Sequence, residues 1–376
     1  MHYSGHTDNE ERPRILWLNA IFLVVTPLAA LILTPLYIYH NGVHWAEPTA
    51  MVVLWYLTGM GVTAGYHRML SHRSWWAPKP IRAILLVLGA ATWQNSAIAW
   101  SAAHRYHHRH ADTDQDPYSI QEGFWWAHML WVMIEGEKHQ DFDSAPDLLD
   151  DELCQWQHKN YFWISTLFNV GVPVALGLLT GRIWGMLLWA GLVRVVVVHH
   201  FTFFINSLAH MWGSRPWNKE ESARDNGLLA FFTFGEGYHN FHHTFPGDYR
   251  NGFRWYQFDP TKWTIWALSK MGLAHDLRRT TMDRRLKKRW QTIRERYEQQ
   301  MDEWNESLRE RVRAAEERLD EALSDMRSKR AEWARRAEEL HESARDELER
   351  ARIEAERRAL EAYRQWHDLI PAHARA

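Results

Sequence analysis

Long apolar runs alternate with polar, histidine-rich segments over residues 1–275. A helix that crosses a bilayer needs roughly 20 mainly apolar residues. One further run, residues 81–100, is interrupted by Gln94, Asn95 and Ser96, and we expect a buried or half-inserted helix there. The pattern predicts an all-α integral membrane protein with four transmembrane helices, at residues 15–39, 47–66, 161–179 and 184–205.

Basic residues gather on one side of these predicted spans. Arg12 and Arg14 precede the first span, and residues 68–82 after the second span contain several more Arg and Lys, whereas the intervening loop HNGVHWAE has none. Because cytoplasmic loops carry the excess of Lys and Arg, we expect both termini and the histidine-rich segments in the cytoplasm, forming a helical cap. A soluble protein with four very apolar core helices is the alternative interpretation.

Residues 276–376 differ from the rest, because Ala, Glu and Arg dominate and no Gly or Pro occurs between residues 273 and 370. Apolar positions repeat every eleven residues, as at Tyr297, Leu308 and Leu319. An eleven-residue period keeps an apolar stripe on one face of a nearly straight helix. We therefore expect a membrane domain, residues 1–275, followed by a long charged helical extension, residues 276–376, built as one rod or as a folded-back pair.

Charge and composition narrow the chemistry. The chain has 44 Lys and Arg against 46 Asp and Glu, a balance that gives no sign of nucleic-acid binding. The single cysteine, Cys154, excludes an intrachain disulfide and a cysteine-rich metal site. The 23 histidines favour imidazole-based metal binding, and the 23 tryptophans suit a protein at the lipid–water boundary.

Three histidine boxes lie beside the predicted spans: HRMLSH, HRYHH and HNFHH. At about 100° per residue, positions i, i+3 and i+4 share a helix face, so each HxxHH box projects three imidazoles in one direction. The histidines of HRMLSH are about 140° apart on a regular helix and converge only where the helix ends or distorts. The boxes contain His67, His72, His104, His107, His108, His239, His242 and His243.

Eight clustered imidazoles exceed the coordination sphere of one first-row metal, so the boxes predict two metal ions held by neutral histidines. His210, in NSLAH at the end of the fourth span, is a ninth candidate, and Asn206 shares its helix face. Histidine ligands usually donate their second ring N–H to a carboxylate or carbonyl. Four acidic residues flank the boxes and are candidates for this role: Asp112, Asp114, Asp116 and Glu236.

The other ionisable residues near the boxes have simpler interpretations. His199, His200 and Arg194 lie inside the fourth span, where an ionisable side chain is either functional or a buried structural partner. Four histidines fit no box and are interpreted as surface residues or neighbours of the ligands: His110, His128, His139 and His158.

The order HRMLSHRSW, HRYHH with DTDQDP, NSLAH and GEGYHNFHHTFPGDYR resembles the membrane fatty acyl desaturases, over roughly residues 51–277. It is most similar to the stearoyl-CoA (Δ9) branch, in a bacterial form, which implies the bacterial inner membrane. The resemblance implies two Fe²⁺ ions held by the eight box histidines and His210, with Asn206 contacting one iron through a water molecule.

The resemblance also implies a narrow acyl tunnel. Its bend would be lined by Gln94, Asn95, Trp100 and Thr202, its far end capped by Trp55 and Gly59, and Arg105 would lie near the CoA. Two departures stand out. Ala103 replaces an Asp common in the family, and Glu135, Glu137 and Lys138 occupy a region that is more basic in CoA-using members. The acyl carrier is therefore CoA, acyl carrier protein or a membrane lipid.

The implied function is the introduction of a cis double bond, at Δ9, into a saturated acyl-CoA with O2 and two electrons. The sequence has no HPGG haem motif, cysteine framework or dinucleotide fingerprint, so a separate ferredoxin, rubredoxin or cytochrome b5-like donor with its reductase is expected. The alternatives are a di-iron membrane hydroxylase of alkanes or lipids, and a non-enzymatic metal carrier or sensor. The extension, which the family does not require, would lie on its own enzyme, form a homo-oligomer, or dock an electron donor or the membrane.

Overall fold

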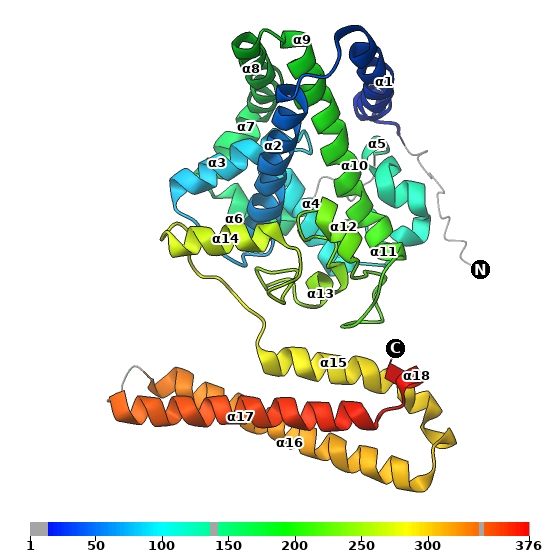
Figure 1. Cartoon of the computed structure of the whole chain (residues 1–376), viewed down its shortest axis with the longest axis vertical. Coiled ribbons are helices and arrows are strands. Elements are labelled where there is room, and N and C mark those ends of the chain that lie inside the picture. Colours follow the sequence, from blue (N-terminus) through cyan, green and yellow to red (C-terminus); the bar gives the residue numbers. More distant parts are fainter. Residues whose placement is uncertain (1–13, 136–141, 338–341, 376) are drawn as a thin grey trace, which may run out of the picture. The chain divides into compact units, whose positions relative to one another are not determined.

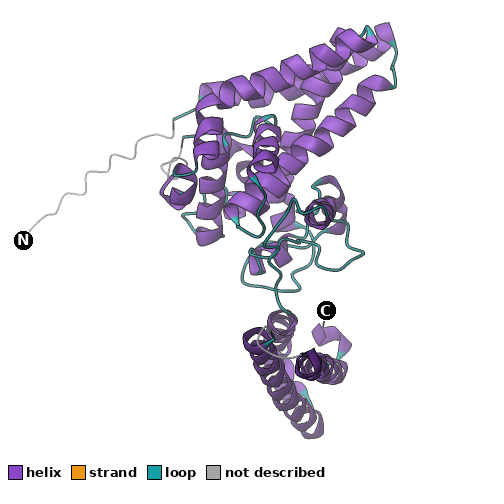
Figure 2. Cartoon of the chain, turned by 90° about the vertical axis from the view of Figure 1, so that its left-hand side faces the viewer, coloured by secondary structure: helices purple, strands orange, loops and turns teal. Residues whose placement is uncertain are grey.

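The computed structural model describes residues 14–135, 142–337 and 342–375, and within these residues it contains helices and loops but no strand (Figures 1 and 2). Arg12, Glu137, Lys138 and His139 lie outside the described residues. Contacts divide the chain into two compact units. The first comprises residues 1–214 and 221–279, and the second comprises residues 215–220 and 280–376.

Among the described residues, three helices of the first unit are long and apolar enough to cross a membrane. They span Trp17–Asn41, Glu152–Thr180 and Ile183–Met211, and each overlaps a run predicted from the sequence. The first is α1 (Trp17–Asn41). The second joins α7 (Glu152–Thr166), a π-helical turn (Leu167–Gly171) and α8 (Val172–Thr180); the third joins α9 (Ile183–Met186), a π-helical stretch (Leu187–Val193), α10 (Arg194–Asn206) and α11 (Leu208–Met211).

The run at residues 47–66 is helical but is not among the three helices of membrane-spanning length and composition in the described chain. It forms α2 (Ala46–Met60), which continues into a π-helical segment, Gly61–Ser71. The His72 N–H bonds to the His67 carbonyl at 3.1 Å, five residues back. This i to i+5 geometry is the distortion that the spacing of HRMLSH requires for its two imidazoles to converge.

The run at residues 81–100 forms two helices instead of one. α3 (Lys79–Ala90) ends before a tight turn in which Trp93 and Asn95 have positive φ, and α4 (Ala97–His110) begins after Ser96. The Ser96 hydroxyl accepts the Ala99 N–H at 3.3 Å and caps α4. The chain changes direction at this turn. As a result, α4, which contains the HRYHH box, packs against the π-helical segment.

Short helices complete this unit around a core that includes Tyr66, Met69, Trp75, Leu86 and Ile98. Full burial of a Leu, Ile or Met side chain from water contributes roughly 1.5–3 kcal/mol. The short elements are Ile120–Glu122, Trp126–Leu130, α5 (Trp131–Met133), Phe142–Ser144, α6 (Pro146–Leu149), α12 (Gly227–Phe232), α13 (His239–Thr244) and α14 (Pro260–Lys270).

The second unit contains a folded-back pair of helices, α16 (Glu306–Arg336) and α17 (Glu342–Leu369), which pack along each other (Figure 1). The eleven-residue stripe of α16 is buried, with Val312, Leu319 and Leu323 at most 1% exposed. The apolar stripe is thus buried by packing within one chain. The remaining elements are α15 (Met282–Tyr297), a 3₁₀ turn (Glu298–Glu303) and α18 (Ala372–Arg375).

Candidate metal centre

Five of the predicted ligands form one group. His67 and His72 come from the π-helical segment, His104 and His108 from α4, and His242 from α13. One nitrogen of each ring lies within 4.8 Å of the corresponding nitrogen of every other ring. The Nε2 atom of His242 is 3.0 Å from Nε2 of both His67 and His108, and Nε2 of His72 is 2.8 Å from Nε2 of His104. We call these residues the first group.

The other four predicted ligands form an adjoining second group. Ring nitrogens of His107, His210 and His243 also lie within 4.8 Å of one another. The Nε2 atom of His239 is 3.0 Å from that of His210 and 3.1 Å from that of His243. The structure therefore brings all nine histidines together, from four segments that are far apart in the sequence.

Outward-facing acceptors orient several of these rings. An Nδ1–H that is donated outward leaves the Nε2 lone pair facing inward, where a metal would accept it. Four rings have such a partner: His67 with Glu236 at 2.8 Å, His107 with Asp116 at 2.8 Å, His243 with Glu221 at 2.8 Å, and His210 with the Ser222 hydroxyl at 2.7 Å.

Two of these acceptors, Asp116 and Glu236, were predicted from their positions beside the boxes. Asp112 instead accepts the backbone N–H of Ser222 at 2.6 Å. Glu221 and Ser222 were missed, because they lie in the polar stretch KEES between NSLAH and the third box. The sequence does contain one indication of these two residues. An acidic or hydroxyl residue in the loop between two histidine boxes is a candidate acceptor for a histidine ring N–H.

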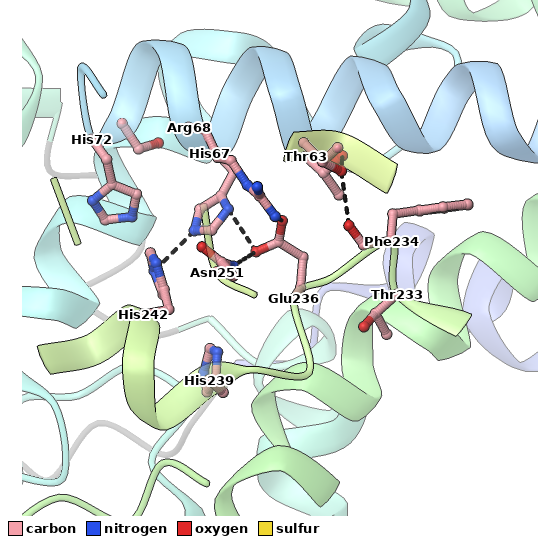
Figure 3. Close-up of polar contacts among 12 residues, drawn as sticks. Thr63, His67, Arg68, His72, Thr233, Phe234, Glu236, His239, His242 and Asn251 are labelled. Atoms are coloured by element: carbon pink, nitrogen blue, oxygen red, sulfur yellow. Dashed lines mark hydrogen bonds and ion pairs between the residues drawn. The ribbon is translucent and has the colours of Figure 1, made fainter. Parts of the chain in front are cut away.

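Glu236 is the centre of a buried ionic network (Figure 3). Its carboxylate lies 2.8 Å from His67 Nδ1, 2.9 Å from an Arg68 guanidinium nitrogen and 2.6 Å from the Asn251 amide nitrogen. Arg68 also pairs with Asp259 at 3.0 Å. Burial alone would raise the pKa of Glu236, but His67 and Arg68 hold it below its ordinary value. Glu236 is therefore ionised and keeps its acceptor role toward His67.

Asp116 plays the same part for the second group. Its carboxylate also accepts the backbone N–H groups of Asp112 at 3.1 Å and Tyr118 at 3.2 Å. Burial alone would raise its pKa, but His107 and these backbone donors hold it below its ordinary value. The turn that follows HRYHH thus folds back to fix one imidazole of that box.

Six of the imidazoles favour the neutral form that binds metal. Burial, reinforced in most of them by the neighbouring rings, lowers the pKa of six imidazoles outside the long apolar helices: His72, His104, His108, His239, His242 and His243. The Nδ1 atoms of His239 and His242 are buried with no hydrogen-bond partner among the described residues. Nε2 atoms of neighbouring imidazoles, such as His67 and His242, lie about 3 Å apart. This arrangement of facing lone pairs is compatible with bound cations. An all-nitrogen donor set suits iron, zinc or copper.

A cavity extends from the imidazoles between α2 and α10. It is lined by Trp55, Gly59, Trp100 and Thr202, four of the predicted substrate residues, and also by Asn206. The sequence did not predict further lining residues, which lie on the π-helical segment, on α10, and at and just after the end of α12. These are Val62, Thr63, Val198, Phe201, Ile205, Phe232, Thr233 and Phe234.

Three predicted substrate residues have other surroundings. Gln94 donates to the Thr202 hydroxyl at 2.9 Å, and the exposed Asn95 donates its backbone N–H to Tyr161. Arg105 donates to the carbonyls of Leu70 at 2.7 Å and Ser71 at 3.1 Å and pairs with Asp147. Arg105 therefore ties α4 to the end of the π-helical segment, which brings His104 beside His72.

The histidines outside the boxes make structural contacts. His128 Nε2 is 3.1 Å from His200 Nδ1, and His199 bonds to the Trp93 carbonyl at 3.3 Å. His158 contacts the Ser96 hydroxyl at 2.6 Å, and His110 packs on Tyr106. Arg194 is buried and donates to the carbonyls of Ala190 and Ala91 and to the side chain of Asn169, which identifies it as a structural partner.

The described residues form helices, three of which have membrane-spanning length and composition. Two adjoining groups of inward-facing imidazoles add the features of a metal centre. Together these features are those of a histidine-rich membrane protein. The chain belongs to the fatty acid desaturase family, whose model matches residues 45–279. This confirms the family resemblance seen in the boxes.

Curated relatives agree with this family. The chain is 40% identical over 267 residues to a probable acyl-CoA desaturase of Schizosaccharomyces pombe, covering 69% of this chain and 54% of that one. It is 35% identical over 268 residues to an sn-2 palmitoyl-lipid 9-desaturase of Nostoc sp., with coverage of 70% and 90%. It is 36% identical over 287 residues to stearoyl-CoA desaturase 5 of Bos taurus, with coverage of 72% and 82%. The chain spans about half the length of the Schizosaccharomyces pombe relative, at 54%.

Proposed function

We propose that this chain is a di-iron fatty acyl desaturase that introduces a cis double bond, at Δ9, into a saturated acyl chain carried as acyl-CoA. The observation that carries the proposal is the pair of imidazole groups at the end of a cavity lined by Trp55, Gly59, Trp100 and Thr202. The acyl chain loses two hydrogens as two electrons and two protons, and O2 takes these up together with two electrons from a separate donor and two protons from solvent, giving two waters.

Each imidazole group would hold one iron. The first group would supply five nitrogens and the second four, and Asn206, which lines the cavity, would contact one iron through a water molecule. Bound iron would supply the oxidising power, with O2, that side chains lack against an unactivated C–H bond. The residues of the chain position and insulate: Glu236, Asp116, Glu221 and Ser222 orient the rings, and the apolar cavity excludes water from the reacting methylene groups.

The cavity would hold the acyl chain with its far end against Trp55 and Gly59. A Cβ on Gly59 would lie 2.2 Å from the Phe234 ring, whose centroid is 4.8 Å from that of Trp55, so this end is closed by aromatic packing. Gln94 and Asn95 would act at the bend, with Gln94 fixing Thr202. Arg105 is engaged by Asp147, so contact with a CoA phosphate requires Arg105 to leave this carboxylate.

The proposed setting is the bacterial inner membrane, with α2 and its π-helical continuation as a fourth span and with both termini and the histidines cytoplasmic. Exposed Trp17, Trp45 and Trp184 stand at the starts of α1, α2 and α9, as interfacial tryptophans do. The electrons would come from a separate ferredoxin, rubredoxin or cytochrome b5-like protein with its reductase. The extension is proposed to serve its own chain, because its apolar stripe is buried between α16 and α17.

The test is expression in a host of defined lipid composition, followed by fatty-acid analysis. We expect a new cis monoene with the double bond at carbon 9. The variant His104→Ala should abolish the product, whereas His110→Ala, on the same helix but packed against Tyr106, should retain it. A hydroxylated product would identify the alternative, a membrane hydroxylase. Unchanged lipids with altered metal uptake would identify a metal carrier.

A further inference from the structure

The segment Arg215–Glu220 belongs to the second unit, although it lies in the sequence between NSLAH and the third box. Side chains of α15 form hydrogen bonds with the backbone of this segment. In addition, the Arg289 guanidinium lies 5.9 Å from the centre of the Trp217 ring. Three donations reach successive carbonyls: Arg296 to Arg215 at 3.3 Å, Arg289 to Pro216 at 2.9 Å, and Thr292 to Trp217 at 2.7 Å. The side chain of Thr292 is buried.

The residues directly after this segment orient two proposed ligands. Glu221 lies 2.8 Å from His243 Nδ1, and the hydroxyl of Ser222 lies 2.7 Å from His210 Nδ1. The segment is the tip of a loop whose base is closed by two backbone hydrogen bonds between Ser214 and Asp225, at 3.0 and 2.7 Å. Glu221 directly follows Glu220, which belongs to the second compact unit. Consecutive Cα atoms are only about 3.8 Å apart.

The acceptors in the site differ in how they are held. The side chains of Asp116 and Glu236 are 1% and 4% exposed, whereas that of Glu221 is 30% exposed. Burial restricts the side chains of Asp116 and Glu236. The position of the more exposed Glu221 depends more on where its backbone is held.

We propose that the C-terminal helical unit positions Glu221 and Ser222 through the segment Arg215–Glu220, and so orients His243 and His210 for the second metal. Glu221 and Ser222 are positioning residues, and α15 is the part of the unit that acts on them. The inference rests on the proposed function. It gives the extension a role in metal retention, and this extension lies beyond Arg279, where the family match ends.

Removing a hydrogen-bond partner of a metal-ligating histidine typically lowers the metal affinity by about 10–100-fold. The test uses the full-length chain, purified with iron, and follows the release of each iron to a chelator. Glu221→Gln and the double variant Arg289→Gln, Thr292→Val should each speed the release of one iron by roughly 10-fold or more and leave the other unchanged. Thr292→Ser, which keeps the hydroxyl, should restore wild-type release when Arg289 is retained.

The matched control is Arg358→Ala, which removes a 2.8 Å surface pair with Asp325 between α17 and α16 and should not change the release of either iron. Circular dichroism verifies that each variant keeps its helices. If the double variant loses helix, the single variant Thr292→Val replaces it. Wild-type release of both irons in a folded α15 variant overturns the inference, as does wild-type release in Glu221→Gln.

Failure of the proposed function gives a different result. A wild-type chain that binds two irons but forms no unsaturated product refutes the desaturase proposal, and the release experiment still decides the inference. A wild-type chain that binds no metal overturns both.

Discussion

The two imidazole groups have the same ligand type but different support. In the first group, His67 is oriented by Glu236, which Arg68 and Asn251 hold inside the protein. In the second group, His243 is oriented by the partly exposed Glu221, which follows a segment packed with another unit. The acceptor in the first group is buried, whereas the acceptor in the second group is partly exposed. Metal retention is where this difference should be seen.

The largest loss of stability should come from removing the Arg68 guanidinium, which pairs with the acceptor of the first group. Arg68→Met leaves Glu236 and Asp259 as buried carboxylates without their partner, which costs about 3–5 kcal/mol of stability. Denaturant unfolding of the detergent-solubilised protein measures this loss. The surface control Arg358→Ala should cost about 0–1 kcal/mol. Equal losses in the two variants would contradict the picture of a rigidly supported first group.

A smaller effect should follow from neutralising each acceptor separately. Glu236→Gln and Glu221→Gln keep the side-chain size but replace the carboxylate, so the affinity of the corresponding metal should fall about 10–100-fold. Competition with a chelator, read out for each iron, measures both affinities. The two variants should weaken different irons. If both weaken the same iron, the division into two groups is wrong.

The smallest effect concerns the outer support of the first group, where Arg105 joins α4 to the π-helical segment. Arg105 and Arg73 lower the pKa of Asp147 to about 2, against the tendency of burial to raise it. A lowered folded-state pKa means that the stabilisation is present above the ordinary pKa of about 3.9 and is lost as the pH falls toward 2. Asp147→Asn should therefore lower the thermal midpoint slightly at pH 5, and the difference from wild type should shrink as the pH falls below 4. A difference that grows on acidification would contradict this role.

Helical spacing made part of the site predictable from the sequence. The HxxHH boxes predict three imidazoles on one face, and the five-residue spacing of His67 and His72 predicts a local distortion, which is present as a π-helical segment. Glu221 and Ser222 could not be predicted, because their contacts depend on how a loop folds back. The break at Trp93 and Asn95 was also missed, since positive φ at these residues has no signature in hydropathy. A rod and a folded-back pair share the same apolar stripe, so only tertiary packing decides between them.

The measurement that tests the central claim most directly is the anomalous diffraction of crystals of the iron-loaded protein at the iron absorption edge. We predict two peaks. One should lie among the Nε2 atoms of the first group, around His242, and the other among those of the second group, around His243. A single peak, no peak, or peaks away from these nitrogens would contradict a two-iron centre built by the nine histidines.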